Sequence, residues 1–231
     1  MSFDFEPEES DLFRIEDALF ADTFSRENRY RFSGQELKIT QTFSSNLGVA
    51  APVWEAAVSL CQYFEEKKFD FTGKRVLELG AGTGIVGILV ALLGGDVTIT
   101  DLPHALKQIQ LNVSSNMPAG CRNFPRVRAL AWGKDHHNFP SDYDLVLGAD
   151  IVYLQDTYPA LLRTLDHLCG EGTTVYLSSK MRREHGAVVF YEEQLPRYLE
   201  AELVHRNDCE NISIFRSTKK THAPFREAKE R

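Results

Sequence analysis

Residues 76–84 read Val-Leu-Glu-Leu-Gly-Ala-Gly-Thr-Gly, and this stretch decides the fold. An apolar strand runs into a turn with glycine at every second position, and an apolar helical run follows at once. Glycine lets the backbone approach a ligand closely, and a helix N-terminus offers free N–H donors to it. A second short strand, 96–100, ends in Asp101, where a carboxylate can hold ribose hydroxyls. The layout predicts a nucleoside pocket.

The acid that precedes the glycines narrows the choice of nucleoside. Glu78 lies two residues before Gly80, at the end of the strand, where its charge would repel a pyrophosphate. A carboxylate there suits a ligand with a cationic amino-acid end, such as S-adenosylmethionine. We favour this cofactor over the dinucleotide of an NAD-dependent oxidoreductase. The pattern E-x-G-x-G-x-G with the downstream Asp101 resembles the class I methyltransferases.

Composition sets the outer limits. The chain has 231 residues, 43% of them hydrophobic, which suits one globular domain. We expect no membrane span, because no run of 18 apolar residues occurs, and the acidic N-terminus is unlike a secretory signal. The four cysteines form no CxxC pair, which favours reduced thiols. A net charge of −7 argues against nonspecific nucleic-acid binding.

The sequence predicts three successive parts of the chain: an arm, a domain and a tail. Residues 1–22 carry eight acids and one arginine and are expected to form an acidic flexible arm. Residues 23–217 are expected to form the methyltransferase domain, and residues 218–231 a polar tail. The domain starts with an alternating pattern over 30–40 that predicts a hairpin, and Pro52 then opens a helix that ends near Lys67.

From residue 74 onward, strands alternate with helices, which is typical of an open parallel sheet covered on both faces. The predicted strands are 75–79, 96–100, 126–131, 144–147 and 173–178. The predicted helices are 83–93, 104–116 and 156–169. Two further strands, 202–207 and 212–217, lie so close in sequence that they predict an antiparallel pair. The expected fold is a seven-stranded, Rossmann-like α/β sheet, mostly parallel, with an antiparallel C-terminal hairpin.

Ligands of such sheets bind outside the carboxyl ends of the strands, so the strand ends predict the site. The candidates at these ends are Glu78, Gly80, Ala81, Gly82, Asp101, Trp132, Ala149, Asp150 and Tyr153. Trp132 is either a core residue or a flat wall against an adenine ring, and its place at a strand end favours the wall. Trp54 lies near the start of a helix, and its position alone indicates a core residue.

Asp150 and Tyr153 form an Asp-x-x-Tyr at the mouth of the sheet. Asp150 could simply cap a helix. Alternatively, the pair orients a methyl acceptor. A lysine amine, with a pKa of about 10.4, must shed a proton before it can attack a methyl group. An apolar channel and a nearby sulfonium both favour the neutral amine, and a carboxylate and a phenol oxygen can then aim its lone pair.

Three other motifs near this edge are interpreted without a catalytic role. An Asn/Asp-Pro-Pro-aromatic motif at this strand end would indicate methylation of a base amine. Residues 148–151 read Gly-Ala-Asp-Ile and do not match that motif. Adjacent His136 and His137 could suggest a metal site, but neighbouring residues seldom converge on one ion, so we expect a polar loop and no metal. Residues 180–185 are interpreted as a solvated loop that could also shape a substrate groove.

The segments 47–57, 78–84, 97–101 and 147–153 resemble the methyltransferase-like 21 group of protein-lysine methyltransferases. Segments 95–103 and 179–186 are similar to the branch of this group that acts on translation elongation factor 1-alpha. The resemblance covers roughly residues 18–217 and leaves both arms outside.

The resemblance implies a lysine N-methyltransferase that uses S-adenosylmethionine and releases S-adenosylhomocysteine. It assigns cofactor contacts to Trp54, Gly80 to Gly82, Asp101, Trp132 and Ala149, and so changes the interpretation of Trp54 from core to cofactor wall. Asp150 and Tyr153 match the group's Asp-x-x-aromatic motif. The expected substrate is elongation factor 1-alpha, or another protein lysine such as a chaperone's. The expected enzyme is a cytoplasmic monomer with a centrosomal pool. A cofactor-binding but inactive module remains an alternative.

Overall fold

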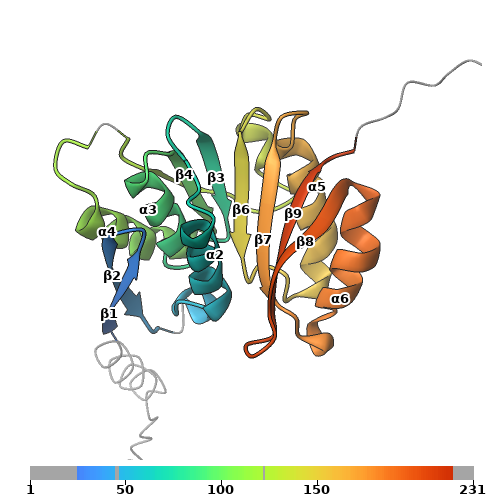
Figure 1. Ribbon diagram of the computed structural model, residues 1–231, viewed down its shortest axis with the longest axis horizontal. Helices are drawn as coiled ribbons and strands as arrows, with labels where there is room; N and C mark the ends of the chain where they lie inside the picture. Colours follow the sequence, from blue (N-terminus) through green and yellow to red (C-terminus); the bar gives the residue numbers. More distant parts are fainter. Residues whose placement is uncertain (1–24, 45–46, 122, 221–231) are drawn as a thin grey trace, which may run out of the picture.

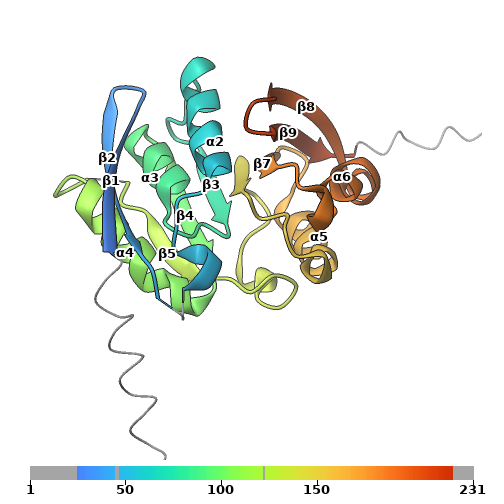
Figure 2. The same cartoon turned by 90° about the horizontal axis from the view of Figure 1, so that it is seen from below.

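Seven strands of the described chain form one sheet with helices on both faces, and a two-stranded hairpin lies beside it (Figures 1 and 2). The computed structural model describes residues 25–44, 47–121 and 123–220. The strands of the sheet are β3 (Arg75–Leu79), β4 (Asp96–Asp101), β5 (Arg126–Ala129), β6 (Leu145–Ala149), β7 (Thr174–Lys180), β8 (Leu199–Asn207) and β9 (Ile212–Lys219). The hairpin consists of β1 (Ser25–Phe32) and β2 (Gln35–Thr42). The helices are α2 (Glu55–Glu66), α3 (Ile85–Leu92), α4 (Leu106–Asn116), α5 (Tyr158–Leu168) and the short α6 (Ala187–Val189).

The strand order in the sheet is β5-β4-β3-β6-β7-β9-β8. Strands β3 to β7 pair in parallel with one another, whereas β9 runs antiparallel to both β7 and β8. This confirms the predicted α/β sheet with its antiparallel C-terminal pair, and it confirms the N-terminal hairpin. Within the described ranges, no helix is long and apolar enough to span a bilayer.

Alternate residues of the central strands face two separate cores, because side chains in a strand point to opposite faces. Val76 packs with α2, α3, α4 and the hairpin on one face. Leu77 and Leu79 pack with α5 and the helical segment after β7 on the other face. Both faces of β3 are therefore buried from Val76 to Leu79, as expected for a strand inside a parallel sheet that helices cover on both faces.

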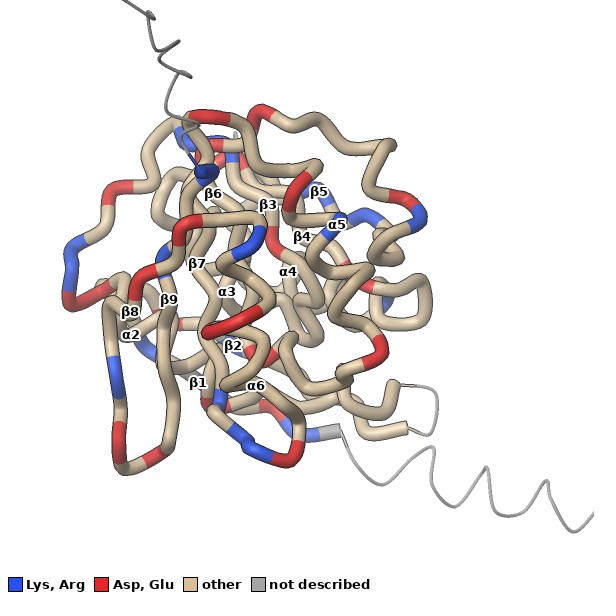
Figure 3. Tube along the Cα trace, turned by 90° about the vertical axis from the view of Figure 1, so that its right-hand side faces the viewer, with Lys and Arg blue, Asp and Glu red and all other residues tan. Residues whose placement is uncertain are grey.

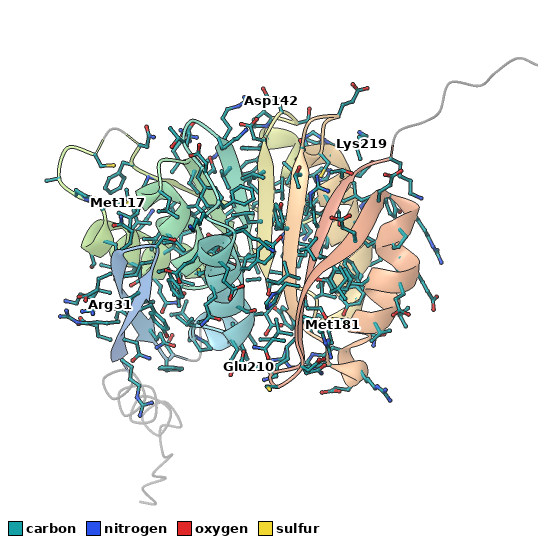
Figure 4. The ribbon with its side chains drawn as sticks, in the orientation of Figure 1. Arg31, Met117, Asp142, Met181, Glu210 and Lys219 are labelled. Atoms are coloured by element: carbon teal, nitrogen blue, oxygen red, sulfur yellow. The ribbon has the colours of Figure 1, made fainter. Side chains whose placement is uncertain are left out.

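The strand order reverses its direction at β3, which has β4 on one side and β6 on the other. Open α/β sheets bind ligands in the crevice outside the carboxyl ends of the strands at such a point. In Figure 4, Asp142 precedes β6 at the upper edge and Met181 follows β7 at the lower edge. The carboxyl ends of the parallel strands therefore face the lower edge of the view.

Of the predicted element boundaries that differ from the structure, two have clear local reasons. The helix predicted to open at Pro52 begins at Glu55, because the backbone N–H of Val53 donates to Gln41 Oε1 instead of entering the helix (2.8 Å). The third strand ends at Ala129 and not at residue 131, because the N–H of Ala131 donates to the Asp135 carboxylate (3.0 Å).

The sequence pattern does not predict the helical segment that follows β7. A short α6 continues into a π-helical turn, Phe190–Gln194, and a 3₁₀ turn, Leu195–Arg197. Its side chains Phe190, Tyr191 and Leu195 are buried in the second core. The segment is too short and too irregular in period for an amphipathic pattern to indicate it.

The predicted acidic arm, 1–22, lies outside the described residues, as does the tail from residue 221. Strand β9 continues to Lys219, two residues beyond the predicted end of the domain. The division of the chain into arm, domain and tail stays a prediction.

Candidate active site

The turn between β3 and α3 has a backbone that only glycine adopts without strain. Gly80, Gly82 and Gly84 all have positive φ, at 58°, 58° and 80°. A Cβ on Gly80 would lie 2.8 Å from the Ile151 side chain and 3.2 Å from the Trp132 ring. The turn after β3 is thus pressed against the chain that follows β6 and leaves no room for a side chain.

Glu78 lies beneath this turn with its carboxyl group buried. The N–H of Gly87, in the first turns of α3, donates to Glu78 Oε2 (2.9 Å), and Thr100 Oγ1 donates to the Glu78 carbonyl (2.6 Å). Burial raises the pKa of Glu78 to about 8, against the hydrogen bond from Gly87, which lowers it. An acid therefore occupies one N–H donor, that of Gly87, at the start of α3.

This contact resolves an ambiguity in the glycine spacing. Gly82, Gly84 and Gly87 also satisfy G-x-G-x-x-G, so spacing alone does not exclude a dinucleotide. A pyrophosphate binds through the N–H groups at the helix N-terminus. Because the carboxyl group of Glu78 lies at one of these groups, the turn disfavours a phosphate and suits a cationic ligand.

Asp101 ends β4 and faces the glycine turn. Its Oδ2 accepts the N–H of Gly82 and its Oδ1 accepts the N–H of Leu102, both at 2.7 Å. Burial raises the pKa of Asp101, while these two hydrogen bonds lower it. Each carboxylate oxygen has a second lone pair, so both can still accept a ribose hydroxyl.

Asp150 follows β6 in the left-handed region, with φ at 55°, which is uncommon for a residue other than glycine. Its N–H donates to the Ser178 carbonyl (2.8 Å), so the turn is tied to the neighbouring strand β7. The side chain is buried and pairs with Arg182. The next helical turn begins at Gln155 and is preceded by Leu154 at its cap, so the helix-cap interpretation of Asp150 is wrong.

Tyr153 also faces the cavity. Burial raises the pKa of Tyr153, and the charge of Asp101 adds to the effect. Asp150 and Tyr153 therefore belong to one site but have different surroundings: Asp150 faces the end of β7, whereas Tyr153 lies within reach of the Asp101 charge.

Both tryptophans line the cavity, and each has its own neighbours. Trp132 lies in the turn after β5, half-buried against the second core and beside Gly80. Trp54 donates its indole N–H to the Val49 carbonyl (2.8 Å), and the Arg182 guanidinium lies 5.6 Å from the centre of its ring. Trp54 is thus not a core residue by position.

One cavity of about 470 Å³ connects these groups, a size suited to a small-molecule ligand. All ten predicted site residues line it: Trp54, Glu78, Gly80, Ala81, Gly82, Asp101, Trp132, Ala149, Asp150 and Tyr153. Their individual roles stay predictions.

Arg182 and His185, from the loop 180–185 that the sequence offered as part of a substrate groove, also line the cavity. The interpretation of residues 180–185 as a solvated loop is wrong for Arg182, since only 20% of its side chain is exposed, whereas the groove interpretation stays a prediction. The place of Arg182 two residues beyond the carboxyl end of β7, at the same sheet edge as the other candidates, is the signal for a role in the site. The sequence pattern does not predict its pairing with Asp150.

The histidines that could have suggested a metal site lie away from the cavity lining. The rings of His136, His137 and His167 lie within 5.2 Å of one another, centre to centre. In the part of the chain that the structure describes, no group of three or more His, Cys, Asp or Glu could hold a metal ion. Asp135 uses its carboxylate to hold the Ala131 turn, as a polar loop would.

The comparison with protein families identifies the family of the chain that carries this site. The family model for lysine methyltransferases matches residues 31–194. The chain belongs to the lysine methyltransferase family. It is 61% identical to EEF1A lysine methyltransferase 3 of Xenopus tropicalis over 87% of this chain and 89% of the relative. It is 58% identical to EEF1A lysine methyltransferase 3 of Mus musculus over 95% and 94% of the two chains.

A solved structure shares the fold. It is a 16S rRNA N2 methyltransferase of T. thermophilus in complex with AdoMet and guanosine, with a TM-score of 0.64 and 18% identity. The match covers 86% of this chain and 51% of that one. At this identity, the likeness shows the class I methyltransferase fold alone.

The lysine methyltransferase described here uses S-adenosylmethionine, and its residues fit that group. The Gly80 cradle would be filled by a single Cβ, and Glu78 lines the same cavity. Asp101 would hold the ribose, Glu78 the cationic amino-acid end and Trp132 the adenine. Membership of the family also excludes the NAD-dependent oxidoreductase that the glycines left open.

Proposed function

We propose that this enzyme methylates a lysine side chain of translation elongation factor 1-alpha. The assignment of this substrate rests on the sequence identity of 61% and 58% to two relatives named for EEF1A, aligned over 89% and 94% of their lengths. In this proposal Asp150 and Tyr153, which line the cavity, meet the substrate lysine.

The cofactor supplies an activated methyl group on a sulfonium, so the enzyme needs no strong base. Its residues must bind the lysine, remove water from it and aim its nitrogen. Apolar walls, among them Ile151 and Leu154, favour the neutral amine over the ammonium. Asp150 and Tyr153 present oxygens that can accept the remaining N–H groups of the amine and orient its lone pair. The proton leaves to solvent through the mouth of the cavity.

We further infer that the partner is a protein and not a nucleic acid. The net charge of −7 supports this, and Figure 3 shows Lys and Arg interspersed with Asp and Glu along the traced segments. A large basic field, which nucleic-acid binding requires, is not visible in that view. The monomeric state, the cytoplasmic location and the centrosomal pool stay predictions.

The test is to incubate the enzyme with isotope-labelled cofactor and a cell lysate, and then to identify the labelled protein and lysine. We expect the main labelled band to be elongation factor 1-alpha. Labelling of a lysine in another protein, such as a chaperone, would assign a different substrate. Absence of any labelled protein would favour an inactive cofactor-binding module.

A further inference from the structure

The carboxylate of Asp150 is already paired in the structure. Arg182 Nη1 lies 3.2 Å from both of its oxygens, and the backbone N–H of Lys180 donates to Oδ1 (3.1 Å). Only 3% of the Asp150 side chain is exposed. A buried carboxylate in such a position strongly needs a partner, and Arg182 supplies a full positive charge.

Arg182 is held in place from both sides. The preceding residue, Met181, forms two hydrogen bonds with Asn211 in the β8–β9 turn: its N–H donates to the Asn211 carbonyl (2.8 Å), and Asn211 Nδ2 donates to its carbonyl (2.9 Å). Figure 4 places Met181 beside this turn, which also carries Glu210. The guanidinium itself lies over the Trp54 ring at 5.6 Å, within cation–π range.

The other charged groups nearby do not replace this pair. Lys180 Nζ lies 3.8 Å from Glu55, at the start of α2. Tyr191, from the π-helical turn, shares a hydrogen bond with Ser179 (2.6 Å); burial raises its pKa, and the Asp150 charge adds to the effect. His185 lines the same cavity, and Glu184 beside it is exposed. Among the ion pairs of the described residues, Asp150 pairs with Arg182 alone.

This pairing has a consequence for the acceptor. A bare carboxylate beside a lysine stabilises the ammonium, which has no lone pair to attack with. A carboxylate that is paired with a guanidinium forms a unit of zero net charge, which can still accept an N–H hydrogen bond. The pair can therefore orient the amine without holding its proton.

We propose that Arg182 is a positioning residue that fixes the Asp150 carboxylate and cancels its charge, so that the acceptor lysine is oriented while it gives up its proton. The proposal rests on the lysine methyl transfer proposed above. In that step the amine, once its proton has left to solvent, forms the N–C bond with its lone pair. The C–S bond breaks, its electron pair stays on sulfur, and the methylated nitrogen then loses a second proton.

The test compares kcat as a function of pH for the wild type, Arg182→Gln and Arg182→Lys, with saturating cofactor and protein substrate. The pH dependence of kcat reports ionisations in the enzyme–substrate complex. For Arg182→Gln, we expect the rising limb to move about one pH unit to the alkaline side. That shift gives about tenfold slower turnover at neutral pH, recovery at higher pH and no rise in KM. Arg182→Lys keeps the charge and should keep the wild-type profile.

Controls separate the possible failures. Arg183→Gln removes an exposed neighbouring charge and should leave the profile unchanged. Calorimetric cofactor binding checks that each variant is folded, and Arg182→Met provides a second neutral variant if the glutamine fails that check. An unshifted profile, or an equal loss of kcat at every pH, would overturn the proposal and show that Arg182 only stabilises the local structure. If the wild type itself transfers no methyl group to protein, the proposed function fails instead.

Discussion

Glu78 Oε2 and the backbone N–H of Gly87 lie 2.9 Å apart, and this hydrogen bond joins the end of β3 to α3 beneath the cavity. The approach is possible because residue 87 has no side chain. A Cβ there would lie 2.4 Å from Glu78 Oε2 and 2.7 Å from Ile99 Cγ1. The same contact fixes the floor of the cofactor site and the packing of its helix.

Gly87→Ala should therefore destabilise the fold, although alanine is the better helix former. Overpacking at this buried position is expected to cost about 1–3 kcal/mol of unfolding free energy. Urea denaturation of the variant measures it. The matched control is Gly172→Ala, where a Cβ would meet nothing within 4 Å. Equal stability of the two variants would contradict the packing described for α3.

The ionisation of Glu78 should be coupled to cofactor binding. Because burial raises the pKa of Glu78 to about 8, the empty protein carries a proton on this group at neutral pH. A cationic cofactor favours the ionised carboxylate, so binding should release the proton, and affinity should rise with pH toward 8.

Titration calorimetry in buffers of different ionisation enthalpy measures that proton. Glu78→Gln keeps an acceptor for the Gly87 N–H but cannot ionise, so its proton release should disappear and its affinity should vary less with pH. The same release in the variant and the wild type would show that another group titrates.

Asp101→Ala should abolish most of the cofactor affinity. The variant loses both acceptors for the ribose and also the bond from Gly82 that shapes the turn. Hydrogen bonds to a charged group contribute about 1.5–3 kcal/mol each, so we expect about 100-fold weaker binding or more by calorimetry. Asp96→Ala, at the other end of β4 in an exposed pair with Arg126, should bind normally. Unchanged cofactor affinity of Asp101→Ala would contradict the assignment of Asp101 to the ribose.

Stability should fall as the pH falls below about 6.5, through His136. Burial lowers the pKa of His136, and the neighbouring His137, His167 and Arg163 lower it further, against Asp135. The unfolded chain then takes up the proton at a higher pH than the folded protein. The stability that depends on a neutral His136 is present above the ordinary pKa and is lost as the pH falls through the folded value.

Urea midpoints measured from pH 7.5 to 5.5 check this. The wild type should lose stability across the range, and His136→Gln should lose less of it, because glutamine does not ionise. Parallel curves for the two proteins would show that His136 does not contribute to the pH dependence.

The fold was predictable because its signals are local. The stretch from Arg75 to Leu79 is a mainly apolar strand that carries Glu78 and is followed by glycines, and the alternation of strands and helices after it indicates a parallel sheet. The same logic placed Asp101 and Asp150 at one edge, since the carboxyl ends of parallel strands meet there.

The remainder of the site depends on contacts between distant residues. Arg182 reaches Asp150 across 32 residues because Asp150 takes a left-handed turn and Met181 is tied to Asn211. Neither feature has a period or a spacing in the sequence. Trp54 likewise lines the cavity, just before α2 begins at Glu55, and the hydrogen bond from Val53 to Gln41 ties this stretch to a hairpin residue that no local pattern indicates.

The most direct measurement of the central claim is methyl transfer to purified elongation factor 1-alpha, read by mass spectrometry of its lysine peptides. The wild type should add methyl groups at a specific lysine. Asp150→Asn, a near-isosteric change, should bind the cofactor but transfer more slowly by about 100-fold or more, as expected when an orienting group is lost. No methylated lysine with the wild type, or transfer by Asp150→Asn at the wild-type rate, would contradict the account.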